Sequence, residues 1–305
     1  MKKMPVVPQQ IDSISQLHRL LGLPKPQHPM VSLVHNCNVR LVKDQFPTTL
    51  LLNFYKISFI QDMRGKVKYG QSFYDFEEGG MVFVAPGQLL TTSPDADEYE
   101  GFNIFVHPDF FRGYPLAASI EKYHFFTYAA NEALHLSDKE RKTILALFRI
   151  IEDELQSNID DSSQDVIISQ IELLLSYSNR FYKRQFTTRK VMNNDLLAKL
   201  EQVLDTYLDK DMALAKGLPT VQYLAEQLHV SPHYLSDMLR TQTGQNAQQL
   251  IHHKIIERAK VLLSNTTLTV AEVAYQLGFE YPQSFNKLFK QKTRVSPLEF
   301  RKSFN

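Results

Sequence analysis

Four side chains near the C-terminus have the types and spacing needed to hydrogen-bond with nucleic acid. Gln283 can bond an adenine through two hydrogen bonds, and Lys287 can reach the acceptors of guanine or a phosphate oxygen. Ser284 lies beside Gln283, and Lys290 follows Lys287 by about one helical turn. These positions would share the exposed side of one helix, and the sequence predicts that this helix enters the major groove of duplex DNA.

The segment that contains these residues occurs twice in the chain. TVQYLAEQLHV, which begins at Thr220, corresponds to TVAEVAYQLGF, which begins at Thr269. One inserted residue in the following turn then aligns Leu235 with Phe285. Two short amphipathic helices with a turn between them, present twice, are typical of tandem helix-turn-helix units. We predict these units at about residues 220–242 and 269–292, with a linking helix at about 246–264.

The repeat assigns equivalent roles to the first unit. His233, Ser236 and Asp237 lie on its open face and are predicted, like Gln283, Ser284 and Lys287, to contact bases. Asp237 would repel a phosphate, so it either accepts a hydrogen bond from a cytosine amino group or forms a local ion pair with Arg240 or a nearby lysine. The predicted phosphate contacts, which would anchor the protein without reading the sequence, are Arg240, Lys290 and Lys292.

Helix-start signals support the assignment. Pro232 and Pro282 each occupy a position where a first helical turn accepts proline. Three pairs have the spacing of a capping box. In this motif the first side chain accepts a hydrogen bond from the backbone N–H of the second residue, and the second side chain accepts one from the backbone N–H of the first. These pairs are Asn246 with Gln249, Thr269 with Glu272, and Ser296 with Glu299.

The distribution of charge is more informative than the net charge of +1. Residues 281–305 contain six basic residues and one acidic residue, whereas residues 195–211 contain five acidic and two basic ones. Positive charge is therefore concentrated at the second predicted recognition helix, where DNA phosphates would lie. The single Cys37 excludes an intramolecular disulfide, and no apolar run has the length of a membrane span, so we expect a cytoplasmic protein.

The C-terminal third resembles the DNA-binding domain of the AraC/XylS family of bacterial transcription regulators. The resemblance lies in LAEQLHVSPHYLSDMLRTQTG and in VAYQLGFEYPQSFNKLFKQKTRVSPLEFR. It implies binding to promoter sites in double-stranded DNA, and contact with RNA polymerase if the protein is an activator. The family usually has glycine at the position of Arg294, whereas the first unit keeps Gly244. Arg294 therefore implies a modified C-terminal cap of that helix.

The N-terminal part has a different pattern. Between about residues 30 and 106, short β-strand-like runs alternate with turn signals, which is typical of a small antiparallel barrel. The stretch GMVFVAPGQ resembles a half-motif of the cupin barrel, and in relatives such a barrel senses a small molecule. The fold class is therefore predicted as α+β, a cupin-like barrel with flanking helices followed by an all-helical domain. The predicted effector pocket, for a small organic ligand, contains Phe54, Tyr55, Phe73, Tyr74 and Phe83, although aromatic residues of this kind can simply fill a barrel.

Three alternatives for the N-terminal part stay open. A metal-dependent cupin enzyme would need closely spaced histidines, and the candidate region NFYKISFIQDMRGKVKYG contains none. We therefore predict no catalytic residues, no metal site and no cofactor. A regulator whose N-terminal domain binds a protein partner, or one that only dimerises, would need no ligand pocket.

Two amphipathic helices follow the strands. They have apolar stripes that would dock on the barrel or, as in relatives, form a homodimer contact. The predicted dimer residues are Ile144, Phe148, Ile151 and Leu174. The predicted domains are a sensor at 1–135, a helical dimerisation segment at 136–186, a linker at 187–194 and the DNA-binding domain at 195–305.

Overall fold

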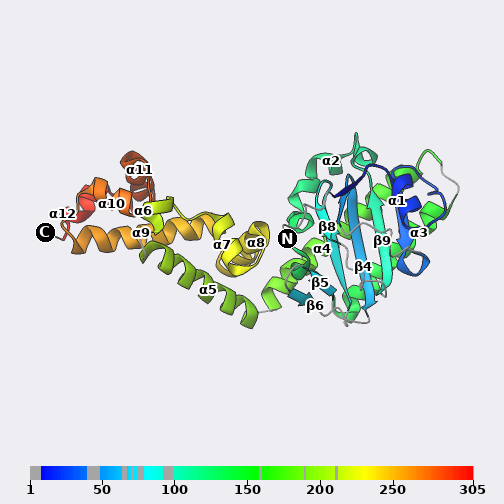
Figure 1. The fold of residues 1–305 in the computed structure, drawn as a ribbon, viewed down its shortest axis with the longest axis horizontal. Coiled ribbons are helices and arrows are strands. Elements are labelled where there is room, and N and C mark those ends of the chain that lie inside the picture. Colours follow the sequence, from blue (N-terminus) through cyan, green and yellow to red (C-terminus); the bar gives the residue numbers. More distant parts are fainter. Residues whose placement is uncertain are drawn as a thin grey trace, which may run out of the picture. The chain divides into compact units, whose positions relative to one another are not determined.

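The computed structural model describes residues 8–39, 49–63, 67–69, 72–74, 79–91, 99–157, 160–188, 190–209 and 212–304. The chain divides into two compact units, Met1–Gln185 (unit 1) and Phe186–Asn305 (unit 2), both drawn in Figure 1. Unit 1 combines sheets and helices, whereas the described residues of unit 2 form helices and the turns between them. The fold class is therefore α+β, as predicted.

A five-stranded antiparallel sheet is the centre of unit 1. Its central strand is β4, which pairs with β7 on one side and with β9 on the other. The strands, in their order across the sheet, are β10 (Leu134–His135), β7 (Gly80–Val84), β4 (Tyr55–Met63), β9 (Tyr99–Val106) and β2 (Val31–His35).

A smaller sheet and one helix enclose the first hydrophobic core of unit 1. The sheet contains β1 (Gln9–Ile11), β3 (Thr49–Leu52) and β8 (Leu89–Thr91), and the helix is α1 (Ile14–Leu20). Leu52 of β3, Phe105 of β9 and Leu17 of α1 belong to one buried cluster, so the core lies between the two sheets. A third sheet pairs β5 (Val67–Tyr69) with β6 (Ser72–Tyr74).

The predicted closed barrel is not present among the described strands. β3 pairs with β1 and β8, and none of these three strands pairs with the edge strands β2 and β10, so the larger sheet stays open. The cupin-like stretch GMVFVAPGQ also does not form a hairpin. β7 and β8 belong to different sheets, and the chain crosses between them at Pro86–Gly87, where the Gly87 N–H donates to the Leu52 carbonyl at 2.8 Å.

Two long helices cover the other face of the five-stranded sheet. α3 (Asp138–Gln156) begins at a capping box, in which the Ser137 side chain accepts from the Glu140 N–H and the Glu140 side chain accepts from the Ser137 N–H. Phe148 of α3 packs against Phe59 of β4, with ring centroids 5.8 Å apart. The second helix is α4 (Ser163–Thr188). Shorter helices between β9 and β10 complete this side: η3 (Pro108–Phe111), α2 (Pro115–Ser119), η4 (Ile120–Lys122), η5 (His124–Thr127) and η6 (Ala130–Glu132). A further short helix, η1 (Asn36–Asn38), follows β2.

The four predicted dimer residues lie inside unit 1. Ile144, Phe148, Ile151 and Leu174 each have no exposed surface. The apolar stripes of α3 and α4 therefore dock on the sheet, which was one of the two arrangements open from the sequence. These four side chains are unavailable for contact with a second chain, so the prediction that they form a dimer interface is wrong.

The predicted pocket aromatics do not converge. Phe54 packs on Phe105 in the core between the sheets, at 5.9 Å between ring centroids. Tyr55 and Phe83 instead face the helices, where both contact the Phe126 ring, at 5.0 and 5.5 Å. The side chains of Phe73 and Tyr74 lie outside the described part of the structure. Phe54 lies in the bend between β3 and β4, whereas Tyr55 begins β4, which separates the two side chains.

Unit 2 is built around one long helix, α9 (Ala247–Asn265), seen in Figure 1. In chain order, α7 (Val221–Leu228) and α8 (Pro232–Thr243) come before α9. The helices after it are α10 (Val270–Gln276), α11 (Pro282–Thr293) and α12 (Pro297–Lys302). α5 (Lys190–Asp209) and α6 (Met212–Lys216) precede α7. The residues predicted as a linker, 187–194, belong to α4 and α5, apart from Arg189, which lies outside the described residues. No described helix has both the length and the apolarity required to cross a membrane.

Candidate DNA-binding interface

The two helix-turn-helix units repeat at the level of single hydrogen bonds. In the first turn, the Val230 N–H donates to the Ala225 carbonyl at 3.0 Å; in the second, the Phe279 N–H donates to the Ala274 carbonyl at 3.0 Å. Both turns contain a left-handed residue, His229 with φ of 57° and Gly278 with φ of 90°. The two units therefore have the same local backbone, as the sequence repeat predicted.

The starts and inner faces of the recognition helices also correspond. Pro232 begins α8 and Pro282 begins α11, each within the first turn. The side chains that fix the two helices to the rest of unit 2 are buried: Tyr234, Leu235, Met238 and Leu239 in α8, and Phe285 and Phe289 in α11. The three predicted capping boxes at Asn246, Thr269 and Ser296 are all formed.

The exposed side of α8 is close to electrically neutral. His233 is exposed, and Ser236 and Asp237 are half-buried. The Arg240 guanidinium donates to the Asp237 carboxylate at 3.0 Å, and only 19% of the Asp237 side chain is exposed. This contact is the local ion pair that was one of the two alternatives for Asp237.

The exposed side of α11 is basic. Gln283, Ser284, Lys287 and Lys290 are all exposed. At about 100° per residue, positions 283, 287 and 290 fall in one row along the helix. This row combines an amide at its start with two cations further along, a combination suited to contacts with bases and then with phosphates.

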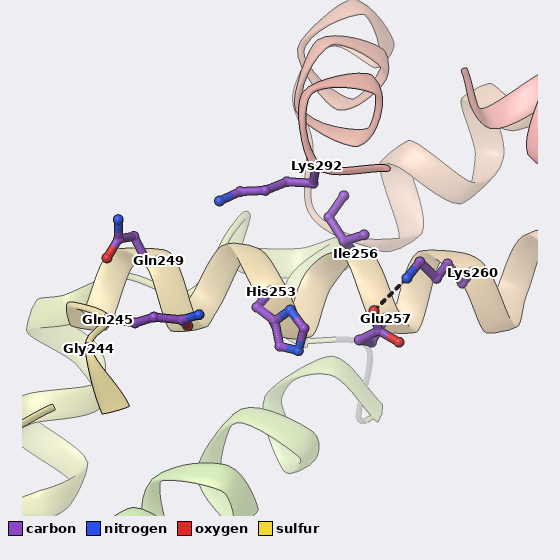
Figure 2. A pocket seen from close by; sticks show the side chains of 8 residues that line it. All are labelled: Gly244, Gln245, Gln249, His253, Ile256, Glu257, Lys260 and Lys292. Atoms are coloured by element: carbon purple, nitrogen blue, oxygen red, sulfur yellow. Dashed lines mark hydrogen bonds and ion pairs between the residues drawn. The ribbon is translucent and has the colours of Figure 1, made fainter. Parts of the chain in front are cut away.

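Lys292 lies on another side of α11, about 180° from Gln283 at the same helical spacing. Its side chain lines a pocket of about 340 Å³ beside α9, shown in Figure 2. The other lining residues are Gly244, Gln245, Gln249, His253, Ile256, Glu257 and Lys260. Lys260 donates to Glu257 at 2.7 Å, which neutralises one cation of the pocket. His252 of α9 is next to His253 in the chain, and burial and the nearby Lys292 ammonium lower its pKa.

The acidic segment 195–211 has a structural role that sequence reasoning missed. Lys254 of α9 forms an ion pair with Asp205 of α5 at 3.0 Å, and Arg258 forms one with Asp209 at 2.6 Å. Each partner is four residues from the next on its helix, so the two pairs fasten α5 along α9. The four-residue spacing in both helices was the available signal, but it does not identify which helices meet.

Phe186 is a further contact that sequence reasoning missed. Its ring packs against Tyr234 of α8, with centroids 5.1 Å apart, and its carbonyl accepts hydrogen bonds from Asn193 and Gln242. Unit 2 therefore includes residues that precede the predicted domain start at 195.

The described residues contain no group of three His, Cys, Asp or Glu side chains placed to hold a metal ion.

Comparison with known proteins places the repeat in a family. A family model described as a helix-turn-helix domain matches residues 224–303. An uncharacterized HTH-type transcriptional regulator of Escherichia coli (strain K12), YijO, is 31% identical over 106 residues, which are 35% of this chain and 36% of that protein. The arabinose operon regulatory protein of the same organism is 30% identical over 110 residues, 36% of this chain and 35% of that protein.

Two solved structures are also similar. The C-terminal domain of the two-component response regulator yesN from Fusobacterium nucleatum is 30% identical, and the match covers 33% of this chain and 96% of that one with a TM-score of 0.29. ToxT from Vibrio cholerae is 14% identical, with 89% of this chain and 98% of that chain covered and a TM-score of 0.30.

The chain spans about a third of the length of the curated relatives it matches. The family model covers α9 and the two repeated units from Leu224 onward. The C-terminal segment of this chain is therefore a helix-turn-helix domain of the AraC type.

Proposed function

We propose that this chain is a sequence-specific DNA-binding transcription regulator. The observation that supports it best is the repeated unit, in which α8 and α11 both begin with a proline in the first turn and bury equivalent side chains, Leu235 and Leu239 in α8 and Phe285 and Phe289 in α11. In such motifs the first residues of the recognition helix contact base edges in the major groove. The proposed base contacts are His233, Ser236, Asp237, Gln283, Ser284 and Lys287.

α9 sets the spacing between the two recognition helices in this proposal. It contains 19 residues and is therefore about 28 Å long. Successive major grooves on one side of duplex DNA lie about 34 Å apart, so a rod of this length is suited to a protein with two readers on one side of the duplex.

Binding of the 305-residue chain to the promoter region upstream of its own gene tests the proposal. The observed affinity should fall steeply with salt, because each phosphate contact releases a counterion. Gln283→Ala and Lys287→Ala should change the preference at particular base pairs by about 1–3 kcal/mol each. Lys290→Ala should weaken binding to all sequences alike and reduce the salt slope by about one.

Lys199→Ala is the matched control, because Lys199 is exposed on α5, outside both recognition helices. It removes the same charge and should leave affinity and salt slope unchanged. Unchanged base preferences of the Gln283 and Lys287 variants, measured by selection from randomised duplexes, would contradict the docking of α11. Binding that does not depend on salt would contradict the assignment as a whole.

The proposal extends to an effector of unit 1. The Ser58 hydroxyl donates to Asn103 at 2.6 Å, and the Asn103 amide donates to Asn36 at 2.5 Å. The Asn36 amide nitrogen is buried without an acceptor in the part of the chain that the structure describes. An oxygen acceptor, from a small organic ligand or from an ordered water, would satisfy this donor. Calorimetric titration of candidate carboxylates and sugars with the wild type and with Asn36→Ala tests it.

The proposal also includes a homodimer, and RNA polymerase as a partner if the protein activates transcription. Large apolar side chains remain exposed on α3 and α4, among them Ile150 at 45% and Leu173 at 44%. They are the residues of this helix pair that a second chain could cover. A regulator whose unit 1 binds another protein through the same side chains is the second candidate, and light scattering of the purified chain separates the two.

A further inference from the structure

The last residue of the repeat differs between the two units in a way that packing does not explain. Gly244 ends α8 with φ of 75°, and its N–H donates to the Arg240 carbonyl at 3.0 Å. Arg294 ends α11 with φ of 70°, and its N–H donates to the Lys290 carbonyl at 2.9 Å. The backbone is the same, but the second unit places a long cationic side chain where glycine is the unstrained residue.

This arrangement lowers stability. A residue with a Cβ is disfavoured in the left-handed conformation, and His229 and Arg294 are the two non-glycine residues that adopt it in the described chain. A Cβ at Gly244 would meet no atom within 4 Å, so the cap position is open to solvent. Arg294 is likewise exposed. Strain at an exposed position without a packing partner favours a functional reason for the side chain.

Position 294 extends the row of α11 that contains the proposed DNA contacts. At about 100° per residue, positions 283, 287 and 290 lie on one side of α11, and Arg294 follows Lys290 by four residues as the left-handed cap of the helix. The row and the cap of α11 together therefore hold three cations, Lys287, Lys290 and Arg294. The equivalent row of α8 holds Asp237, Arg240 and Gly244, and its two charges are paired with each other.

In the proposed docking, with α11 lying across the major groove, the length of the helix brings its end over the DNA backbone. Its 12 residues span about 18 Å, whereas the major groove is about 12 Å wide. A helix that reads bases with its first turns therefore crosses the phosphates with its last turn. The carbonyls at a helix C-terminus are partially negative, so a phosphate can approach there only if cations are present.

The neighbouring acidic residue, Glu299, offsets part of the positive charge of Lys290, but in the described part of the chain it forms no ion pair with α11. Glu299 accepts a hydrogen bond from the Ser296 N–H at 2.7 Å as part of the cap of α12. That contact and the nearby Lys290 hold the pKa of Glu299 below its usual value. Among the described residues, Lys287, Lys290 and Arg294 form no ion pair.

We propose that Arg294 binds a DNA phosphate at the end of α11, and that it occupies the anchoring position predicted for Lys292. Lys292 lies on the opposite side of the helix, in the pocket beside α9 (Figure 2). The inference rests on the proposed DNA-binding function. The second unit would then make most of the salt-dependent phosphate contacts. It has three cations, Lys287, Lys290 and Arg294, whereas Arg240 of the first unit is paired with Asp237.

Three substitutions at position 294 in the full chain separate the charge from the backbone strain. Arg294→Gly should raise Tm by about 2–4 °C, because glycine relieves the left-handed strain, and should lower the salt slope of DNA binding by about 0.9. Arg294→Ala should lower the slope equally without raising Tm. Arg294→Lys should leave both unchanged. The DNA probe is the duplex on which the wild-type chain shows its salt dependence.

Two further variants complete the test. Lys199→Ala removes an exposed charge from α5 and should leave the slope unchanged. Gly244→Arg should add about 0.9 to the slope and lower Tm, because it creates the second-unit cap in the first unit. A wild-type slope in Arg294→Ala overturns the phosphate contact, and a lower Tm in Arg294→Gly overturns the strain argument. Absence of DNA binding by the wild type instead overturns the proposed function, so the two failures are distinguishable.

Discussion

Gly278, in the turn of the second helix-turn-helix unit, lies in backbone contact with Gly217, which follows α6. A Cβ built on Gly278 would be 2.7 Å from the Gly217 carbonyl carbon and 2.8 Å from the Ala213 oxygen. Gly278 also has φ of 90°. The turn therefore needs glycine for two reasons, and the close approach holds α10 and α11 on the segment that follows α5.

Gly278→Ala should destabilise unit 2 by about 3 kcal/mol, as the sum of overpacking against backbone and left-handed strain. Gly244→Ala is the matched control. It introduces the same methyl group at φ of 75° with no atom within 4 Å, so it should cost only about 1 kcal/mol. Urea unfolding followed by circular dichroism measures both. If both variants lost the same free energy of unfolding, the close contact with Gly217 would add no cost to that of the left-handed conformation.

The ion pair between Asp237 and Arg240 predicts an unusual gain on substitution. Asp237→Asn should free the Arg240 guanidinium to contact a phosphate, and thus raise the affinity for unrelated sequences and add about 0.9 to the salt slope. In an Arg240→Gln background the same change should have no effect on the slope, which is the control. If Asp237 instead reads a cytosine, Asp237→Asn will reduce the preference at one base pair by about 1–3 kcal/mol and leave the slope unchanged.

The difference between neighbours on α4 gives a third prediction. Leu174 is buried and Leu173 is 44% exposed. Leu174→Asp should unfold unit 1, because an unpaired carboxylate would enter the core against the sheet. Leu173→Asp should leave the fold intact and, if the exposed apolar residues of α4 form the homodimer contact, should produce a monomer. Circular dichroism reports folding and light scattering reports mass. If Leu174→Asp gave a folded monomer, Leu174 would be a dimer contact and not a core residue.

Local signals were the predictable part of this fold. The capping boxes at Ser137, Asn246, Thr269 and Ser296 depend on residues three positions apart, and each is formed. The inner faces of α8 and α11 followed from helical periodicity alone.

Long-range pairing was not predictable in the same way. An apolar stripe on α3 requires a partner, but Phe148 does not specify whether that partner is Phe59 of the sheet or a second chain. For the same reason the strand runs of unit 1 were located without their order, and two sheets were taken for one barrel. Lys292 was predicted to contact a phosphate because it is basic. Its angular position on α11, about 180° from Gln283, instead separates it from the row of proposed DNA contacts.

The capping box of α10 predicts a pH dependence of stability. The Thr269 N–H donates to the Glu272 carboxylate at 2.6 Å, and this hydrogen bond with that of the Thr269 side chain lowers the pKa of Glu272. A lowered pKa in the folded state means that the ionised carboxylate stabilises the fold. That stabilisation is complete above the unfolded value of 4.5 and is lost as the pH falls through the lowered folded value.

Glu272→Gln should therefore lower the unfolding midpoint relative to the wild type at pH 7, and the difference should shrink steadily as the pH falls below about 4.5. Glu201→Gln is the control, because Glu201 is exposed on α5 and takes part in none of the capping boxes described above. Thermal unfolding of the full chain between pH 3 and pH 7 measures the effect. Gln249 already fills the equivalent position in the cap of α9, so that helix start should contribute equally at both ends of the range. A Glu272→Gln difference of the same size at pH 3 and pH 7 would show that the hydrogen bond does not require the charge.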